Sequence, residues 1–169
     1  MFKGKDQQAR HGGPRGSRKE PSEYEEAVLQ IDRVTRVVKG GRRLRFRATV
    51  VIGNKNGKVG IGIGKSHEVV AAIQKAINQA KKSLIVVPLK NGTIPHEVHM
   101  KYKTAKILMM PAGPGTGVIA GGAVRKIAEL AGIKNILSKM FGARNRITNA
   151  KATMLALQKL KIYDSSAHA

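Results

Sequence analysis

The sequence predicts an α+β fold made of two small units in succession. Its 169 residues are enough for one domain or for two small ones. Apolar side chains alternate over residues 43–52, and a helical apolar stripe follows over residues 69–80. A further run of strand and helix patterns starts near residue 101. We therefore expect an α-β-β-β-α unit over residues 22–90 and a β-α-β-α unit over residues 91–163.

The segments outside these two units have a different composition. Residues 1–20 contain six Lys or Arg, four Gly and one Pro, and they offer few apolar side chains to a core. We interpret residues 1–21 as a flexible basic arm and residues 164–169 as a tail. A mitochondrial transit peptide is the alternative for the arm, but the apolar stripe of an amphipathic helix is missing from it.

The first unit is expected to open on a short helix and to continue into a strand. The segment PSEYEE, at residues 21–26, resembles a helix start because its acidic side chains would lie near the positive end of the helix dipole. Apolar positions within residues 28–38 then indicate a strand, and the pair Gly40-Gly41 indicates the turn that ends it.

The next two strands complete an antiparallel meander. The apolar residues from Leu44 to Ile52 fall on one face, whereas three arginines and Thr49 fall on the other. A polar turn at residues 54–57 leads to residues 59–64, where every second position is glycine. That strand has one face without side chains, which lets a helix or another backbone approach it closely.

A helix is expected to complete the first unit. Ser66 is the predicted N-cap, Glu68 lies in the predicted first turn, and residues 69–80 carry the apolar stripe. Beyond the helix, apolar segments on either side of an Asn-Gly pair within residues 84–100 resemble a hairpin that joins the two units.

The second unit starts with a short strand and a glycine-rich loop. Residues 107–110 predict the strand, and the sequence PAGPGTGVIAGG follows it closely. A helix is expected over residues 123–131, with Gly132 as its C-terminal cap.

A strand and a helix are expected to end the second unit. Residues 136–141 indicate the strand. An apolar stripe between residues 147 and 160 predicts the helix, with Thr148 or Asn149 as its N-cap.

The charge balance narrows the classes of function. The chain contains 32 Lys and Arg against 10 Asp and Glu, for a formal net charge of +22. Residues 33–65 alone hold ten basic residues and no acid. A charge of this size repels itself unless a polyanion neutralises it, so we expect a nucleic acid or an anionic membrane surface as partner. No apolar run approaches the ~18 residues that a membrane span needs, and we expect no membrane partner of that kind.

The scarcity of acids argues against catalysis. Beyond the opening segment, the acids within the two units are Asp32, Glu68, Glu97 and Glu129. Acid–base, metal-assisted and phosphoryl-transfer chemistry mostly depend on carboxylates. The chain has no Cys, which removes thiolate nucleophiles, disulfides and Cys-ligated metals. We therefore predict no enzyme, no catalytic residues, no cofactor, no metal site and no small-molecule substrate.

Three segments resemble ligand motifs but lack a required feature. GKS at residues 64–66 resembles the end of a phosphate-binding P-loop, yet the glycine that the motif needs at position 59 is Val59. Residues 115–120 match a dinucleotide signature, yet no acid follows ~20 residues later to hold a ribose. The two histidines within residues 96–99 would point to opposite faces of a strand, which disfavours chelation.

The clearest candidate for polyanion binding is the turn between the first two predicted strands. The sequence KGGRRLR, at residues 39–45, forms a compact basic projection. Glycines permit close contact with a phosphate backbone, and arginines bind phosphate through paired hydrogen bonds. Three Tyr, three Phe and no Trp argue against stacking platforms for single strands. We therefore expect structured RNA or a duplex, read through shape and phosphate contacts.

Four stretches of the sequence resemble the bacterial-type family of small-subunit ribosomal protein five. They are VVKGGRRLRF, GKVGIGIGKSHEVVAAIQKAINQAKK, NGTIPHEV and PAGPGTGVIAGGAVRKIAELAGIKNILSK, and they follow the order of the family. The resemblance covers about residues 25–160. It implies an N-terminal domain of the double-stranded-RNA-binding type and a C-terminal α/β domain.

The resemblance also implies a function and partners. It implies a structural constituent of the small ribosomal subunit in the cytoplasm, which binds small-subunit (16S) ribosomal RNA and helps assembly. Contacts with small-subunit proteins four and eight are implied as well. So are a place at the head–body junction and the mRNA entry region, and a part in decoding accuracy.

The resemblance places its functional residues in both units. The turn at residues 39–43 is implied to reach RNA, and residues 115–125 are implied to face protein four. The turn GARNR, at residues 142–146, departs from the family's Gly-Ser-x-Asn-Pro-like pattern by two arginines. The expected protein-interface residues are Gly115, Thr116, Gly117 and Arg125. The expected RNA-binding residues are Lys39, Gly40, Gly41, Arg42, Arg43, Arg45, Arg47, Lys55, Lys58, Lys65, Arg144 and Arg146.

Two other functions stay open at this point. The loop around Gly115-Thr116-Gly117 resembles the phosphate loop of galactokinase-like kinases, but Glu129 is the only acid between residues 101 and 163. A free duplex-RNA-binding chaperone is the second alternative. Sedimentation with small ribosomal subunits would separate both from the ribosomal function.

Overall fold

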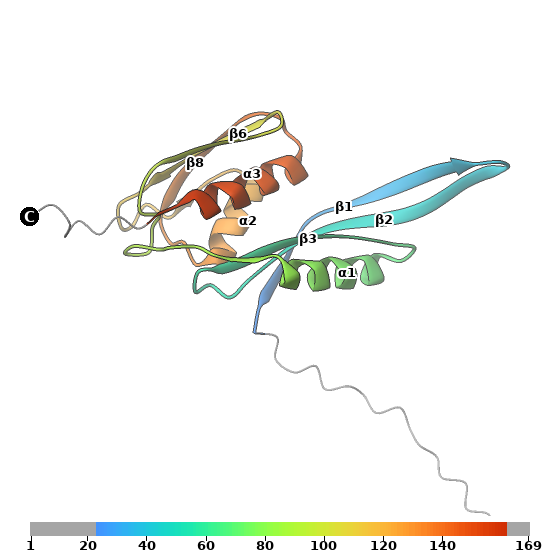
Figure 1. The fold of residues 1–169 in the computed structure, drawn as a ribbon, viewed down its shortest axis with the longest axis horizontal. Helices are drawn as coiled ribbons and strands as arrows, with labels where there is room; N and C mark the ends of the chain where they lie inside the picture. Colours follow the sequence, from blue (N-terminus) through green and yellow to red (C-terminus); the bar gives the residue numbers. More distant parts are fainter. Residues whose placement is uncertain (1–22, 162–169) are drawn as a thin grey trace, which may run out of the picture.

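The computed structural model describes residues 23–161, so the expected arm and tail lie outside the described residues. This part of the chain forms two four-stranded sheets and three helices, which confirms the α+β prediction (Figure 1). In chain order the elements are β1 (Glu25–Val38), β2 (Gly41–Gly53), β3 (Lys58–Ser66), α1 (Val69–Lys82), β4 (Leu84–Val86), β5 (Val98–Tyr102), β6 (Ala105–Pro111), β7 (Val118–Ile119), α2 (Gly122–Ala131), β8 (Ile136–Gly142) and α3 (Arg146–Lys159).

The first sheet has the strand order β1-β2-β3-β4, and all neighbouring strands are antiparallel. The three predicted meander strands are confirmed. The short helix expected over residues 21–26 is wrong, because β1 begins at Glu25 and pairs from there with the end of β2. Glu25 lies opposite Gly53, and Glu26 lies opposite Ile52. The main-chain ladder of the sheet outweighs the local helix signal, so the first unit reads β-β-β-α-β rather than α-β-β-β-α.

The β1–β2 hairpin is longer than the rest of its sheet. It turns at Lys39-Gly40, where the φ of +85° at Gly40 favours glycine. β3 pairs with β2 only from Phe46 to Gly53, so residues 39–45 extend past the end of β3. Figure 1 shows this part of the hairpin projecting beyond α1, away from the rest of the molecule.

Helix α1 packs on the glycine face of β3, as the alternation predicts. A Cβ atom at Gly62 would collide with the carbonyl oxygen of Ala76, and Cβ atoms at Gly60 and Gly64 would meet main-chain atoms of α1 in the same way. Glycine is therefore required there for close helix–sheet contact. The small core between α1 and β2 consists of Ala48, Val50, Ile52, Ala72, Ala76, Ile77 and Ala80.

The start of α1 differs from the prediction. Ser66 is the last residue of β3 and pairs with Phe46, so its assignment as the N-cap is wrong. The N-cap is Glu68, which has an extended backbone and makes no side-chain capping bond. The β2–β3 ladder continues as far as Ser66, so α1 begins only at Val69, three residues later.

The hairpin expected within residues 84–100 is also wrong. β4 pairs with β3 of the first sheet, whereas β5 pairs with β6 of the second. The Asn-Gly pair forms a tight turn that is closed only by a single bridge between Lys90 and Thr93. The two strands separate because Val98 of β5 is buried in the core of the second unit.

The second sheet has the strand order β5-β6-β8-β7. β7 and β8 are parallel, and α2 provides the crossover that a parallel pair requires. α2 and α3 pack against one face of this sheet. Gly132 ends α2 with a φ of +85°, which confirms the predicted cap. β5 and the two-residue β7 add to the β-α-β-α order expected from the sequence.

Helix α3 begins at a different cap from the one expected. Asn145 is the N-cap, and its side chain accepts a hydrogen bond from the main-chain N–H of Ile147 at 2.9 Å. Thr148 and Asn149 therefore lie inside the helix, and their assignment as caps is wrong. Asn149 is buried and donates from its side-chain amide to the carbonyl of Ala143, which fixes the turn before the helix.

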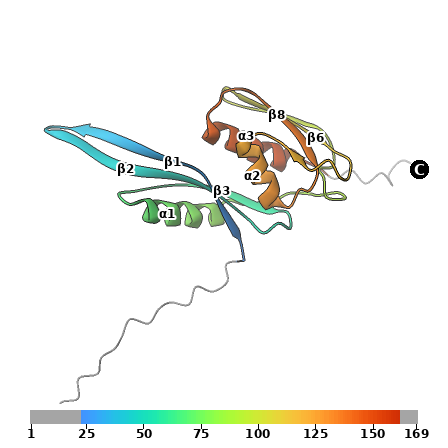
Figure 2. The same cartoon turned by 180° about the vertical axis from the view of Figure 1, so that it is seen from behind.

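The second unit docks on the face of the first sheet opposite α1 (Figure 2). The main-chain N–H groups of Lys55 and Gly57 donate to the carbonyls of Leu130 and Ala131, both at 2.9 Å. A Cβ atom at Gly53 would collide with the carbonyl of Leu130, so this contact also depends on glycine. The C-terminal end of α2 thus rests directly on the β2–β3 turn.

The larger core includes residues from both sheets. Leu29, Val51 and Val59 of the first sheet join one buried cluster with residues of α2, α3, β5 and β6. The predicted boundary between the first and the second unit, at residues 90 and 91, stays a prediction. Within residues 23–161, no helix is both long enough and apolar enough to cross a membrane.

Candidate nucleic-acid interface

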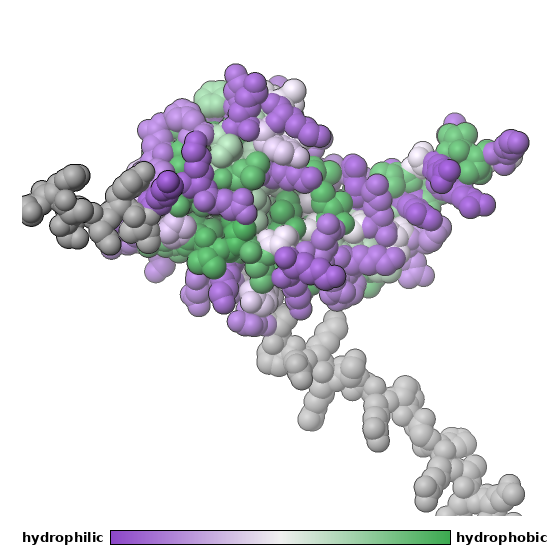
Figure 3. Space-filling view, in the orientation of Figure 1, coloured by the Kyte–Doolittle hydropathy of each residue, from purple (hydrophilic) through white to green (hydrophobic). Residues whose placement is uncertain are grey.

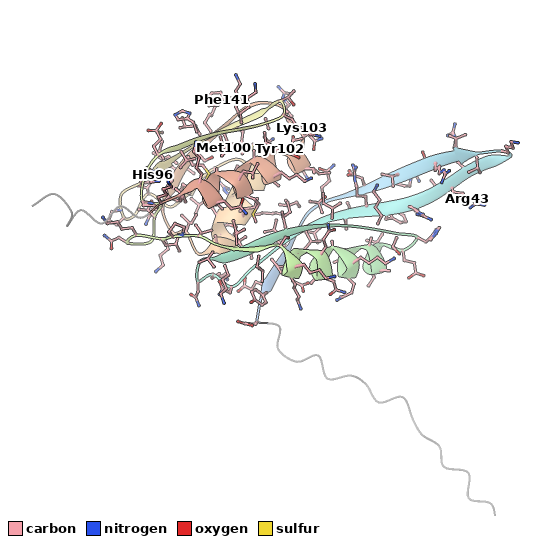
Figure 4. All side chains as sticks on the ribbon, in the orientation of Figure 1. Arg43, His96, Met100, Tyr102, Lys103 and Phe141 are labelled. Carbon is pink, nitrogen blue, oxygen red and sulfur yellow. The ribbon has the colours of Figure 1, made fainter. Side chains whose placement is uncertain are left out.

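The projecting part of the β1–β2 hairpin is strongly basic. Residues 33–47 contain seven Lys or Arg and no acid. Main-chain pairing places Arg36 directly opposite Arg43, and both side chains are exposed. Opposite residues of an antiparallel pair lie on one face, where like charges repel. A bound polyanion would relieve this repulsion. Figure 3 shows hydrophilic residues along the hairpin, with apolar residues between them near its tip, and Figure 4 shows Arg43 on the projecting part.

One face of the hairpin forms a continuous basic surface. The face that carries Arg36 and Arg43 continues through Arg45 to Arg47, which lies opposite Lys65 of β3. A pocket of about 420 Å3 lies on this face. Its lining residues are Val34, Thr35, Arg36, Val38, Arg43, Arg45 and Lys65.

Arg47 differs from the arginines of the tip because it has an acidic partner. Its Nε and Nη2 atoms donate to Oδ2 of Asp32 at 3.1 and 2.7 Å, and Gln30 donates to Oδ1 at 2.5 Å. The pKa of Asp32 lies below its ordinary value, mainly because the side chain of Arg47 donates hydrogen bonds to the carboxylate. Burial acts in the opposite direction, whereas the hydrogen bond from Gln30 and the charges of Arg47 and Arg146 also lower this pKa. This predicted RNA contact is therefore partly neutralised by the protein itself.

Arg144 and Arg146 come from the second unit but lie beside the hairpin. Arg144 is in the turn before α3, and Arg146 is the first residue of that helix. Nη1 of Arg146 donates to the carbonyl of Leu29 at 3.2 Å. Leu29 is the extra residue of a β-bulge in β1, which leaves its main chain out of the regular ladder. The fold thus brings Arg144 and Arg146 to the same pocket as Arg47.

Lys55 and Lys58 lie at the opposite end of the first sheet from the hairpin tip. Lys58 begins β3 and Lys65 is near its end, so the strand separates them. Nζ of Lys55 forms an exposed ion pair with Oε1 of Glu25 at 2.6 Å. The structure therefore divides the predicted RNA-binding residues into three groups. They are the tip (Lys39, Gly40, Gly41, Arg42, Arg43, Arg45), the junction between the units (Arg47, Lys65, Arg144, Arg146), and the far end (Lys55, Lys58).

The predicted protein-interface residues lie in a loop and on a helix of the second unit. Gly115 and Gly117 have φ values of +91° and +73°, and the N–H of Gly117 donates to the side chain of Asn135 at 3.0 Å. Thr116 is exposed between them. Arg125 is exposed on α2, and no hydrogen bond among residues 23–161 joins its side chain to the loop.

Two basic residues of the interface escaped the sequence prediction. Arg36 lies on β1 within the projecting part, whereas Arg33 lies opposite Phe46 where β3 ends, and both are exposed. The signal that could have found Arg36 is the tight turn at Gly40, because a two-residue turn fixes the register and places Arg36 opposite Arg43.

The histidine segment shows no chelating arrangement. Only His99 lies on a strand, whereas His96 lies in the bend before it, so the expected placement of both on one strand is wrong. His99 contacts Oε1 of Glu97 at 2.7 Å. Among the described residues, no three His, Asp or Glu side chains gather to hold a metal ion.

Comparisons with known proteins define the class of the chain. "Small ribosomal subunit protein uS5" of Thermotoga maritima is 54% identical over 138 residues, which cover 82% of this chain and 78% of the relative. The protein of the same name from Picosynechococcus is 50% identical over 152 residues, which cover 89% and 88%. "Small ribosomal subunit protein uS5c" of Rhodomonas salina is 50% identical over 147 residues, which cover 86% and 88%. The fold with its basic hairpin therefore falls in the class of ribosomal proteins.

The family follows from both halves of the chain. The model of the ribosomal protein S5 N-terminal domain matches residues 24–88, and that of the ribosomal protein S5 C-terminal domain matches residues 100–169. The chain belongs to the ribosomal protein S5 family. Members of this family are structural proteins and not enzymes, which confirms the prediction of a non-enzyme and excludes the kinase alternative.

Proposed function

We propose that this chain is a structural constituent of the small ribosomal subunit and binds small-subunit (16S) ribosomal RNA. Membership of the ribosomal protein S5 family supports the first part. The observation that carries the second part is the projecting hairpin, whose residues 33–47 contain seven basic side chains and no acid. A two-stranded hairpin without a core of its own is only marginally stable in water. A bound partner that covers the projecting part would therefore stabilise it.

The chemistry of the hairpin fits RNA phosphates better than bases. Arginine guanidinium groups bind phosphate through paired hydrogen bonds, and the hairpin tip presents Arg42, Arg43 and Arg45 in exposed positions. Phe46 is the one aromatic residue of β2 and packs against the core of α1, so it is not free to stack on bases. Contact with about 6–10 phosphates would lower the affinity by about 10³–10⁵ between 50 and 200 mM salt.

The proposal extends to the neighbours of the chain in the subunit. The loop at Gly115–Gly117, in which Gly115 and Thr116 are exposed, and the exposed Arg125 form the surface for small-subunit protein four, and the sheet and helices of the second unit face protein eight. The hairpin tip takes its place at the head–body junction, near the mRNA entry region. In this position the protein helps assembly and supports decoding accuracy in the cytoplasmic ribosome.

The hairpin provides the test of this function. Arg42→Glu with Arg43→Glu should weaken binding to a 16S RNA transcript by at least about tenfold, because both side chains would then repel phosphates. It should also reduce the amount of protein that sediments with small subunits in a sucrose gradient. Affinity is measured with the purified full chain by filter binding.

A matched variant separates the hairpin from overall charge. Lys75→Glu with Lys81→Glu makes the same change of net charge on the exposed face of α1, where neither residue is a predicted RNA contact. Equal losses in both variants would contradict the assignment to the hairpin. Protein that stays outside the small-subunit fractions would favour the free RNA chaperone instead.

A further inference from the structure

Three arginines from two different units converge on one pocket at the junction of the hairpin and the second unit. The pocket has a volume of about 510 Å3. Its lining residues are Gln30, Ile31, Arg47, Arg144, Asn145 and Arg146. Figure 1 shows why these segments meet, since the first turn of α3 points toward the hairpin, and Figure 2 shows the same arrangement from behind.

Asp32, the acid that contacts the pocket residue Arg47, already accepts hydrogen bonds at both carboxylate oxygens. Nε and Nη2 of Arg47 donate to Oδ2, and the side chain of Gln30 donates to Oδ1. Asp32 therefore forms its ion pair with Arg47, whereas the charge of Arg146 acts on it without a hydrogen bond. Within residues 23–161, neither of these two arginines forms an ion pair.

The hydrogen bond of the Arg146 side chain holds this residue in place without neutralising its charge. Its Nη1 atom donates to the main-chain carbonyl of Leu29, which is a neutral acceptor. Lys126 of α2 donates in the same way to the carbonyl of Val28 at 2.7 Å. The bulge of β1 thus holds two cations of the second unit in position, and Arg146 lines the pocket with guanidinium donors that make no other hydrogen bond within residues 23–161.

Arg144 and Arg146 lie at a helix start, where the helix dipole disfavours positive charge. They flank Asn145, the N-cap of α3, where the helix dipole is positive. The first turn of α3 contains no acid, and the Asn145 side chain already accepts from Ile147. An anion in the pocket would reverse each of these unfavourable interactions at once.

We propose that this arginine pocket binds one backbone phosphate of RNA, held by Arg144 and Arg146 with Arg47 behind them. A phosphodiester fits because the pocket is the continuation of the basic hairpin face, on which Arg45 and Lys65 are the next cations. One strand of RNA can therefore follow the hairpin and then contact the second unit. The phosphate ties the two units together through the same ligand. This inference rests on the RNA-binding function proposed above.

The test compares two variants of the full chain with equal net charge. Arg144→Gln with Arg146→Gln changes the pocket, and Lys75→Gln with Lys81→Gln changes the exposed face of α1. Loss of one phosphate contact should make the dependence of log affinity on log salt shallower by about 0.7–0.9. Between 50 and 200 mM salt, the affinity ratio of wild type to pocket variant should therefore shrink by about threefold. The α1 variant should keep the wild-type slope.

Ethylation interference on the 16S transcript locates the contact. Ethylation of a phosphate blocks its binding to arginine, so the wild type should show one interfering phosphate that the pocket variant no longer shows. All other interfering positions should be common to both proteins. The single change Arg144→Gln repeats the test if the double variant melts at a lower temperature, because the side chain of Arg144 makes no hydrogen bond within residues 23–161.

The outcomes separate this inference from the function on which it rests. If the wild type binds the transcript and the pocket variant keeps both its salt slope and its interference pattern, the phosphate site is wrong and the RNA-binding function stands. If the wild type does not prefer the transcript to an unrelated RNA, both are wrong. Inorganic phosphate would be the true ligand of the pocket in one case only: it shifts the NMR signals of the Nε–H groups of the pocket arginines, while wild type and pocket variant have the same salt slope for RNA. In that case the pocket is a free-phosphate site and the inference is overturned.

Discussion

The two halves of strand β2 behave differently although they belong to one continuous ladder. Residues 48–53 are fully buried, with α1 covering one face and the second unit covering the other. Residues 41–45 are exposed on both faces and carry three arginines. Both halves pair with β1 in antiparallel fashion, although the bulge at Leu29 shifts the register by one residue within the buried half. The main difference between the two halves therefore lies in what covers them.

This contrast separates stability from binding along a single strand. Burial of apolar area stabilises the fold by roughly 25 cal/mol per Å2, so the buried half contributes to folding and the projecting half contributes little. In the projecting half, the opposed Arg36 and Arg43 side chains repel each other in the free protein. We expect substitutions in the buried half to change folding, and substitutions in the projecting half to change binding.

The largest difference between the two halves is expected at glycine. Gly62→Ala would place a Cβ atom against the main chain of α1, so the helix must move away from the sheet. We expect the free energy of unfolding to fall by more than about 4 kcal/mol. Urea denaturation followed by circular dichroism measures it.

Gly41→Ala is the matched change in the projecting half. A Cβ atom there meets no heavy atom within 4 Å, and Gly41 does not have a positive φ. We expect a change of less than about 1 kcal/mol, with a slight gain from the smaller entropy of the unfolded chain. Similar losses in the two variants would show that the tip also contributes to the packed core.

A second pair of substitutions tests the apolar residues of β2. Ile52→Ala removes a side chain that is 0% exposed, and we expect a loss of about 3 kcal/mol in the free energy of unfolding. Leu44→Ala removes a side chain that is 47% exposed, and we expect a loss below about 0.5 kcal/mol. Thermal and urea unfolding measure both. A large loss from Leu44→Ala would mean that the tip folds against another part of the chain.

Local periodicity explains the parts of the fold that the sequence predicts well. The alternation from Leu44 to Ile52 and the glycines from 60 to 64 each define a face within one strand, and both faces are found as expected. The turn at Gly40 and the cap at Gly132 depend on backbone conformations that glycine favours. Each of these signals is contained within a few residues.

The errors arise where a distant partner decides the structure. The acids at the start of β1 resemble a helix cap, but the strand forms because the end of β2 is available for pairing. Ser66 belongs to β3 for the same reason, because it pairs with Phe46 of β2. The helix cap at Asn145 depends on the turn before it. The buried side chain of Asn149 fixes this turn by donating a hydrogen bond to the carbonyl of Ala143.

The candidate site follows the same rule. The arginines of the tip can be recognised from one short segment, because residues 39–45 form a single turn. The pocket cannot be recognised in this way, because Arg47 and Arg146 are brought together by the packing of α2 and α3 on the first sheet. No periodic pattern in the sequence encodes the docking of one unit on another.

An effect that is smaller than those at Gly62 and Ile52, and that depends on pH, is expected at the border between the two halves of β2. Asp32→Asn removes the carboxylate that binds Arg47, and we expect a loss of about 1 kcal/mol in the free energy of unfolding at pH 7, since the pair is partly exposed. The folded pKa of Asp32 is lowered from 3.8, so its contribution is complete above that value and disappears as the pH falls through the folded pKa. Wild type and variant should therefore have the same stability in strong acid. Glu25→Gln is the control, because its ion pair with Lys55 is exposed and should contribute less than about 0.5 kcal/mol. If the two variants lose equal stability at pH 7, or if the loss from Asp32→Asn is the same at every pH, then Asp32 does not stabilise the border of the hairpin through its charge.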